Sequence, residues 1–280
     1  MTPPEVISYD CGCTLPIVIT VLLLSHTSFV FTAYLLHYYD GATTGRVLPT
    51  LASYLRAGVW ESWYELVSTL SYPLGWLPSP SPLAYDPMGG PPVVLVHGYI
   101  RNRGSMLVIY WRLKRAGFRN IYNLGLGNTL APIEVLAERV RTRLTTIATL
   151  TQGAPLVGIG HSMGGIVLRW CVDHGAPIGR IITIATPHRG TRMAYVAPGE
   201  SAVQLRPDSV FLASLSDPPS VPLTALYTTH DNIVVPCDSA AYGDAPKRFE
   251  GRGHLTMLYD GEVFESILEL LDTRRAEQAD

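Results

Sequence analysis

Residues 160–165 read Gly-His-Ser-Met-Gly-Gly, and no other segment constrains the fold of the chain as strongly. An apolar run at 156–159 precedes this segment, and a helical stretch at 163–174 follows it. The pattern predicts a strand and a helix joined by a very tight turn. Neighbouring backbone segments nearly touch in such a turn, so we expect that only residues without a Cβ fit at Gly160 and Gly164.

Similar apolar runs recur along the chain and alternate with helical stretches. Unbroken apolar runs are typical of strands that are covered on both faces, as in a parallel sheet. The expected strands lie at 93–96, 121–124, 156–159, 181–184 and 223–227, and the expected helices at 105–116, 132–150, 163–174 and 262–271. This alternation predicts an α/β fold with a mostly parallel sheet and helices on both of its faces.

The tight turn places Ser162 at the N-terminus of a helix. We expect the turn to lift the serine oxygen clear of the sheet, where the helix dipole and the free amides favour negative charge. Ser162 is therefore the candidate nucleophile. A chance match to the G-x-S-x-G pattern is the alternative, and the strand–turn–helix context argues against it.

A serine hydroxyl needs a base that takes its proton, and the base needs an acid that orients it. Where this motif carries such a triad, the acid and then the histidine follow the serine along the chain. His254 is the last histidine, in a loop between an edge strand expected at 248–250 and the last helix. Asp231 follows a predicted strand at once, and catalytic groups sit just past strand ends. We therefore prefer Asp231 as the acid over Asp238 and Asp244, which lie further along the same loop.

Attack by a serine on a carbonyl creates an oxyanion, which needs preorganised N–H donors. The first expected donor is the backbone amide of Met163, directly after the candidate nucleophile. The second comes from the loop after the first strand, which begins His97-Gly98-Tyr99, and we assign it to the amide of Tyr99.

Several short motifs in this order resemble bacterial triacylglycerol lipases and related esterases. They are Val-His-Gly-Tyr at 96–99, Gly-His-Ser-Met-Gly-Gly at 160–165, Ala-Thr-Pro-His-Arg-Gly-Thr at 185–191, Gln-Leu-Arg-Pro-Asp-Ser at 204–209 and Gly-His at 253–254. The resemblance covers about residues 93–272 and leaves out the first 90 residues.

The resemblance implies the α/β-hydrolase fold and hydrolysis of carboxylic esters, most simply lipid or acyl esters, through an acyl-enzyme on Ser162. Two alternatives stay open, because one scaffold of this kind supports many reactions. The same triad could transfer an acyl group to an alcohol other than water, or the chain could be a catalytically silent, membrane-bound binding module. No cofactor is implied. Some lipases of this family carry a structural calcium, but no carboxylate cluster in this sequence requires one.

The N-terminal part of the chain contains a long apolar segment. Residues 11–39 include no Asp, Glu, Lys or Arg, and the most apolar stretch runs over 15–36. About 20 apolar residues in a helix cross the hydrocarbon core of a bilayer, so residues 15–36 are predicted to be a single-pass membrane anchor. A cleaved signal peptide is the alternative, but it would call for a positive N-terminal region and an Ala-x-Ala-like site. Arg46 and Arg56 weakly favour a cytoplasmic catalytic domain.

Residues 47–77 show apolar side chains at spacings of three and four, which predicts one or two amphipathic helices. A helix packed on the catalytic domain is favoured over an interfacial helix, because the segment has no Lys that anionic lipid would attract. Six of the fifteen residues from 78 to 92 are proline, which is typical of a linker. The expected organisation is an anchor at 1–40, an amphipathic segment and linker at 41–92, and a self-sufficient catalytic domain at 93–280.

Charge and cysteine content exclude other classes of function. The chain is 47% hydrophobic and only 16% charged, well below the ~25% charged residues of an average soluble domain. The formal net charge is −2 with no long basic run, so nucleic acid is not an expected partner. Four cysteines, Cys11, Cys13, Cys171 and Cys237, form no Cys-x-x-Cys pair, which argues against a structural zinc site. The sequence carries no indication of the oligomeric state.

Overall fold

The structure is a computed structural model that describes residues 14–44, 49–78, 82, 84–243 and 245–272, with the side chains of the first helix described from Val18 onwards. Four residues used in the sequence analysis, Cys11, Cys13, Arg46 and Asp244, lie outside the described residues, as does part of the proline-rich segment.

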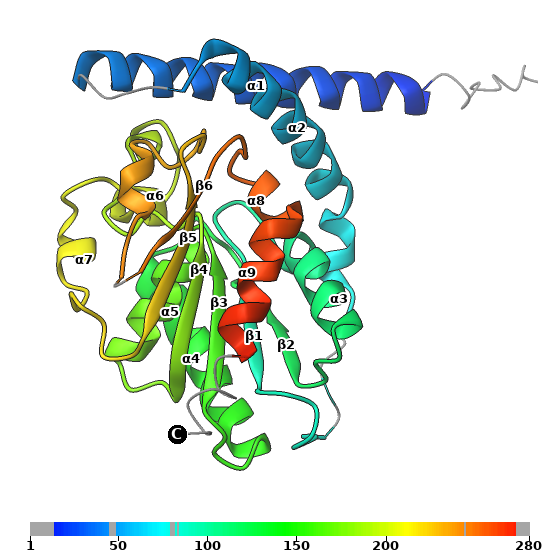
Figure 1. Ribbon diagram of the computed structural model, residues 1–280, viewed down its shortest axis with the longest axis vertical. Helices are drawn as coiled ribbons and strands as arrows, with labels where there is room; N and C mark the ends of the chain where they lie inside the picture. The colour runs from blue at the N-terminus through cyan, green and yellow to red at the C-terminus, as the bar shows by residue number, and fades with distance from the viewer. Residues whose placement is uncertain (1–13, 45–48, 79–81, 83, 244, 273–280) are drawn as a thin grey trace, which may run out of the picture.

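A six-stranded sheet of order β2-β1-β3-β4-β5-β6 forms the centre of the molecule, and every neighbouring pair of strands is parallel (Figure 1). The five predicted strands and the edge strand are all present, and the fourth begins three residues earlier than expected. The strands are β1 Val93–Val96, β2 Ile121–Leu124, β3 Leu156–His161, β4 Ile178–Ile184, β5 Leu223–Thr228 and β6 Lys247–Phe249.

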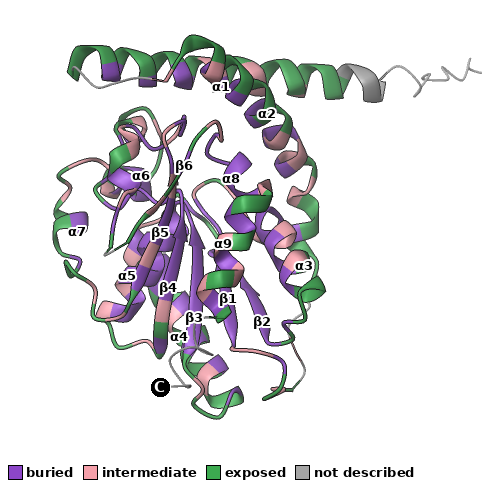
Figure 2. Cartoon of the chain, in the orientation of Figure 1, coloured by how far each residue is buried: buried purple, intermediate pink, exposed green. Residues whose placement is uncertain are grey.

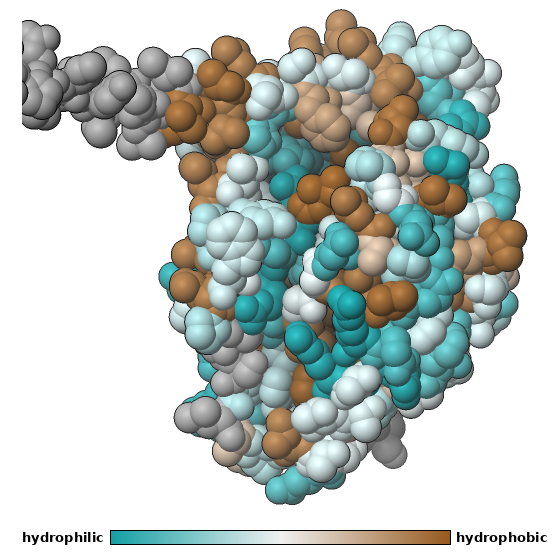
Figure 3. Space-filling model, turned by 180° about the vertical axis from the view of Figure 1, so that it is seen from behind, coloured by the Kyte–Doolittle hydropathy of each residue, from teal (hydrophilic) through white to brown (hydrophobic). Residues whose placement is uncertain are grey.

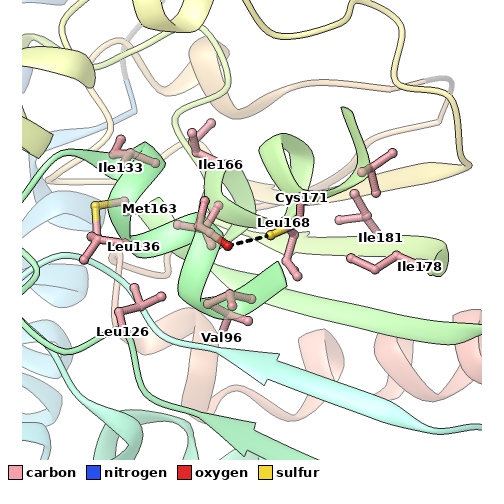
Figure 4. Packing of buried hydrophobic residues seen from close by; sticks show 14 of the residues in the cluster. Val96, Leu126, Ile133, Leu136, Met163, Ile166, Leu168, Cys171, Ile178 and Ile181 are labelled. Atoms are coloured by element: carbon pink, nitrogen blue, oxygen red, sulfur yellow. Dashed lines mark hydrogen bonds between the residues drawn. The ribbon is translucent and has the colours of Figure 1, made fainter. Parts of the chain in front are cut away.

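Both faces of the sheet are covered, which explains why its strands read as unbroken apolar runs. In β1, Val94 and Val96 pack into one hydrophobic cluster with helices α4 and α5, while Val93 and Leu95 pack into another with α3 and α9. Figure 4 shows the first cluster, where the Cys171 thiol on α5 donates to the carbonyl of Ala137 on α4 at 3.3 Å. The helices and 3₁₀ turns of this domain are η2 Arg103–Met106, α3 Leu107–Arg115, α4 Ile133–Leu150, α5 Met163–Asp173, η3 Arg192–Tyr195, α6 Glu200–Gln204, α7 Val210–Ala213, η4 Cys237–Ala240, α8 Thr256–Tyr259 and α9 Gly261–Asp272.

The first helix, α1 (Thr14–Thr44), lies across the end of the domain at which the strands terminate (Figure 1). Its stretch Val18–Thr44 is long and apolar enough to cross a membrane. Most of this helix is exposed, but Val30, Ala33 and Tyr34 are buried against the rest of the protein (Figure 2). In the view of Figure 3, hydrophobic side chains gather at this end of the molecule. Helix α1 is therefore both a surface-exposed apolar helix and a packed part of the fold.

The C-terminal half of α1 is tied to the loop that follows β5. The Tyr34 hydroxyl donates to the carbonyl of His230 at 3.0 Å, and the His37 ring Nδ1 donates to the carbonyl of Asp231 at 2.8 Å. Near the end of the helix, Asp40 forms an ion pair with Arg192 of η3. Three consecutive turns of α1 thus contact segments that surround the candidate site.

The amphipathic segment forms α2 (Leu51–Leu70), followed by the short 3₁₀ helix η1 (Tyr72–Trp76). Thr50 caps α2, accepting a hydrogen bond from the amide of Ser53 at 3.3 Å. The buried face of α2 contacts the segment after His254 through Glu61. Asn102, in turn, donates to the carbonyl of Tyr72 at 2.8 Å. These contacts join α2 and η1 to segments that follow the proline-rich stretch, and they connect polar partners that lie far apart in the sequence.

Candidate active site

Ser162 occupies the tight turn between β3 and α5, with φ 55° and ψ −127°. The backbone of a residue that carries a side chain is strained at a positive φ of this kind, and such strain is characteristic of functional sites. The two glycines of the motif permit the turn, as expected: a Cβ on Gly160 would lie 2.5 Å from the amide nitrogen of Gly165, and one on Gly164 would lie 2.3 Å from the carbonyl oxygen of Val96. Both clashes would be with backbone atoms, and these cannot move without disturbing the strand or the helix to which they belong.

Asp231 and His254 lie 23 residues apart in sequence and meet in the structure. His254 Nδ1 is 3.0 Å from each carboxylate oxygen of Asp231. The Oδ1 atom of Asp231 also accepts from the amides of Ile233 at 2.9 Å and Val234 at 2.7 Å. Because an ionised carboxylate only accepts, Nδ1 carries the proton and Nε2 keeps its lone pair. This is the tautomer that a general base facing a serine needs.

The two rival acids are placed differently from Asp231. Asp231 is 1% exposed, whereas Asp238 is exposed to solvent and Asp244 lies outside the described residues. Asp238 approaches the thiol of Cys237, its neighbour in sequence. The geometry therefore brings His254 together with the acid that the sequence analysis preferred.

The charges around His254 favour its protonated form. Burial alone would lower the pKa of His254, but the carboxylate of Asp231, aided by Glu61 and Glu65, raises it above its usual value. The neighbouring His161 shows the opposite effect, because burial and the proximity of His254 lower its pKa well below the usual range. His161 Nε2 donates to the carbonyl of His254 at 3.2 Å, so this neutral ring supports the backbone of the candidate base.

A cavity of about 530 Å³ opens beside Ser162 and His254, and Tyr99 lines it as well. Phe29 of α1 forms part of the wall, so the helix that lies across the domain also borders the cavity. The segments around η3 and α6 contribute an apolar part of the wall, namely Met193, Ala194, Val196, Ala197, Pro198, Ala202 and Leu205. Polar side chains also line the cavity, namely Ser25, His26, Glu65, Thr69 and Arg101. The cavity therefore suits an apolar group placed beside a serine hydroxyl.

The two backbone amides predicted to bind an oxyanion belong to segments that lie next to Ser162. Met163 is the first residue of α5, where amides have no partner within the helix. A Cβ on Gly98 would lie 2.8 Å from the Cβ of Ser162, so the loop after β1 passes directly over the serine. Tyr99 follows Gly98 in this loop, and its hydroxyl donates to the carbonyl of Pro198. These positions suit the assigned role.

Sequence reasoning missed three charged residues beside the site: Glu61, Glu65 and Arg101. Glu61 and Glu65 are buried on α2, and Glu65 forms an ion pair with Arg101 in the loop after β1. The sequence contains one indication of the two glutamates. They are four residues apart, and like charges at this spacing repel each other on an isolated helix. On a helix whose other charged side chain is Arg56 alone, such a pair indicates buried partners. Among the described residues, no group of three or more His, Cys, Asp or Glu side chains could hold a metal ion.

The parallel sheet, the two layers of helices and the serine turn define the α/β-hydrolase fold, in the form found in lipases and esterases. Lipase B of Aspergillus fumigatus is similar in structure, with a TM-score of 0.58 and 20% identity over 66% of this chain and 53% of the fungal chain. This chain thus spans about half the length of that lipase.

Two bacterial proteins show the same likeness over nearly their whole length. The mature lipase BlEst2 of Bacillus licheniformis has a TM-score of 0.53 and 17% identity, over 69% of this chain and 96% of its own. The product of the gene lin2722 of Listeria innocua has a TM-score of 0.50 and 16% identity, over 65% of this chain and 94% of its own. No protein-family model and no curated protein matches the sequence. At these identities the structural likeness establishes the fold, and the chemistry must be argued from the site.

Proposed function

We propose that the chain is a serine hydrolase that cleaves carboxylic esters, with Ser162 as nucleophile, His254 as general base and Asp231 as the acid that orients it. The observation that carries the proposal is the buried Asp231–His254 pair, whose imidazole borders the same cavity as a serine in a strained turn. The lipases with the same fold support it further.

In this proposal His254 Nε2 takes the proton of Ser162 as the serine oxygen attacks the carbonyl carbon of the ester. The amides of Met163 and Tyr99 bind the resulting oxyanion. When the intermediate collapses, His254 returns the proton to the departing alcohol, and the acyl group stays on Ser162. Water then attacks the acyl-enzyme by the same sequence of proton transfers. Asp231 keeps Nδ1 protonated throughout and stabilises the charged imidazolium.

The substrate that fits this site is an ester with an apolar acyl chain. The cavity wall contributed by the residues around η3 and α6 is apolar, and burial of each CH₂ group there contributes about 0.8 kcal/mol. Affinity should therefore rise with chain length until the cavity of about 530 Å³ is full. The cavity also reaches α1, whose exposed face is apolar, so a lipid-like substrate is favoured over a soluble one.

The test combines covalent labelling with turnover. A fluorophosphonate probe should label the wild-type protein and leave Ser162→Ala unlabelled. Hydrolysis of p-nitrophenyl esters should be fastest at an intermediate acyl length and should vanish in Ser162→Ala, because loss of a triad member costs on the order of 10⁶ in kcat. A wild-type protein that neither labels nor turns over any ester would instead support a silent binding module. Product analysis with competing alcohols separates hydrolysis from acyl transfer, since only a transferase would form the new ester in preference to the acid.

We also propose that the protein is held at a membrane through residues 15–36 of α1; the stretch is apolar, and most of the side chains described from Val18 to Leu36 are exposed. The full chain should remain in the pellet when membranes are washed with alkaline carbonate. Release into the supernatant would contradict an integral anchor. A shortened mature N-terminus, measured by mass spectrometry, would show a cleaved signal peptide instead.

A further inference from the structure

A glutamate outside the expected catalytic domain contacts the backbone of the loop that carries His254. Glu61, on α2, is 0% exposed. Its Oε1 accepts from the amide of Leu255 at 2.7 Å, and its Oε2 accepts from the amide of Thr256 at 2.9 Å and the Thr256 hydroxyl at 2.7 Å. Leu255 and Thr256 directly follow the candidate base, so one side chain holds the two residues that set the direction of the imidazole.

The arrangement is specific for a carboxylate. Three donors converge on two oxygen atoms, and an ionised carboxylate is the side chain that accepts at every site it offers. A glutamine at this position would turn an NH₂ group toward the amide of Thr256 or of Leu255, so that two donors would face each other. The carboxylate also lies directly over Gly253, where a Cβ would be 2.3 Å from Oε2 of Glu61. The glycine before His254 is therefore required by the glutamate.

Burial disfavours the ionised form of Glu61. Burial, and after it the charge of Glu65, raises the pKa of Glu61 to about 7, against the three hydrogen bonds that lower it. The ion pair with Arg101 offsets part of the charge of Glu65. An apolar side chain at this position would leave the buried amides of Leu255 and Thr256 without their acceptor. The presence of Glu61 beside the candidate base points to a role in the chemistry.

We propose that Glu61 is a positioning residue for His254: it fixes the backbone at Leu255 and Thr256 so that Nδ1 stays on Asp231 and Nε2 remains available to Ser162. The inference rests on the proposed function, because it assigns Glu61 to the same reaction. In this proposal α2 contributes a residue to the active site, although α2 lies before the proline-rich segment. The negative charge of Glu61 also favours the imidazolium that forms during the reaction.

The other titratable and charged groups near the pair come from several elements. Glu65 lies on α2 itself, Tyr34 on α1 and Tyr259 on α8. Asp231, His161 and Arg101 lie in the loops or strand ends that border His254. The carboxylates of Asp231, Glu61 and Glu65 each raise the pKa of His254, so removal of Glu61 leaves less negative charge around the imidazole.

The principal test is Glu61→Gln in the full-length protein, with folding checked by circular dichroism and thermal unfolding. We expect kcat for a short-chain ester to fall about 10- to 100-fold with little change in KM, because a displaced catalytic group slows the chemistry without changing substrate contacts. The acidic limb of the pH–kcat profile should move to lower pH, because His254 loses a nearby negative charge. Glu138→Gln, which neutralises an exposed glutamate on α4, is the matched control and should change neither quantity. A folded Glu61→Gln with wild-type kcat and pH profile would overturn the proposal.

Thr256→Val provides a second variant that leaves Glu61 in place and removes one of its three donors. It should lower kcat severalfold, since the loop that carries His254 loses one of the contacts that fix it. If Glu61→Gln fails to fold, an unchanged kcat in Thr256→Val overturns the proposal.

A readout that needs no turnover separates this inference from the proposed function. NMR titration of ¹⁵N-labelled histidines should show a lower pKa for His254 in Glu61→Gln than in the wild-type protein, with the signal assigned by its loss in His254→Ala. An unchanged His254 pKa would overturn the inference even if the wild-type protein hydrolyses esters. Failure of the wild-type protein to label or turn over would overturn the proposed function and leave this titration to decide whether Glu61 acts on His254.

Discussion

His254 is surrounded by more negative charge than its one hydrogen-bonded carboxylate supplies. Asp231 contacts Nδ1 directly, while Glu61 and Glu65 act from α2. Burial opposes the charged imidazole, and these carboxylates outweigh burial and raise the pKa of His254. The candidate base is thus tuned by carboxylates from two regions that lie far apart in the sequence.

This tuning predicts the pH dependence of activity. The imidazole must be neutral to take the proton of Ser162, so activity should increase as pH rises through the pKa of His254. Because that pKa is raised above the ordinary value of 6.5, the acidic limb of the pH–kcat/KM profile should have its midpoint above pH 6.5. Measurement of kcat/KM for a soluble ester between pH 5 and pH 9 (a range of about four units that spans the histidine pKa) checks this. A midpoint clearly below 6.5 would contradict it.

The choice of acid can be tested by comparing matched variants. Asp231→Asn should lower kcat by several orders of magnitude, on the order of 10⁴ for the equivalent change in a well-studied protease, because the imidazole then adopts the wrong tautomer. Asp238→Asn is the control, since Asp238 is exposed and approaches the Cys237 thiol rather than His254. Kinetics of both purified variants decide the point, and a larger loss in Asp238→Asn or in Asp244→Asn than in Asp231→Asn would show that the acid is misassigned.

At the scale of elements, the position of Ser162 depends on how closely α5 approaches β1. The turn between β3 and α5 brings Gly164 against the carbonyl of Val96, and the loop after β1 brings Gly98 against Ser162. Strand and helix can meet at this distance only without side chains between them. The same closeness places the first amides of α5 beside the serine.

A pair of glycine variants tests this packing. Gly164→Ala places a Cβ 2.3 Å from a backbone oxygen, so the variant should fail to fold or lose nearly all activity. Gly261→Ala, at the start of α9, meets no atom within 4 Å and should fold normally, since alanine favours a helix by about 1 kcal/mol over glycine. Thermal unfolding and ester turnover measure both. A soluble, active Gly164→Ala would mean that the turn is looser than described.

At the scale of the whole molecule, α1 and α2 precede the proline-rich segment and contact the part of the chain that carries the candidate site. Helix α2 supplies Glu61 to the His254 loop, and α1 supplies His37 to the carbonyl of Asp231. Phe29 of α1 also borders the cavity. The two helices thus contact the candidate acid, the candidate base and the substrate cavity.

We therefore expect the shortest active chain to start before α2 and not at the proline-rich segment. A chain that starts at Met88 loses α2, which leaves the amides of Leu255 and Thr256 without their acceptor and exposes an apolar surface. We expect it to aggregate or to be inactive. A chain that starts at Thr50 keeps α2 and should be soluble and hydrolyse short-chain esters, although less efficiently than the full protein. Gel filtration and turnover measure both chains, and a soluble chain from Met88 with full activity would show that α2 is dispensable.

The sequence by itself determined the elements and most of the candidate site. Its apolar runs and glycine spacing are local features, and local features specify strands, helices and the turn at Ser162. The order of the segments then indicated Asp231 and His254, because groups at the ends of parallel strands gather at one edge of the sheet. The contacts of α1 and α2 were decided by the tertiary structure alone. The hydrogen bonds of Glu61 span 194 and 195 residues, and a single glutamate carries no periodic pattern that would reveal its partners. The sequence of an apolar helix such as α1 also does not show which of its residues contact lipid and which pack on protein. Both surroundings favour apolar side chains.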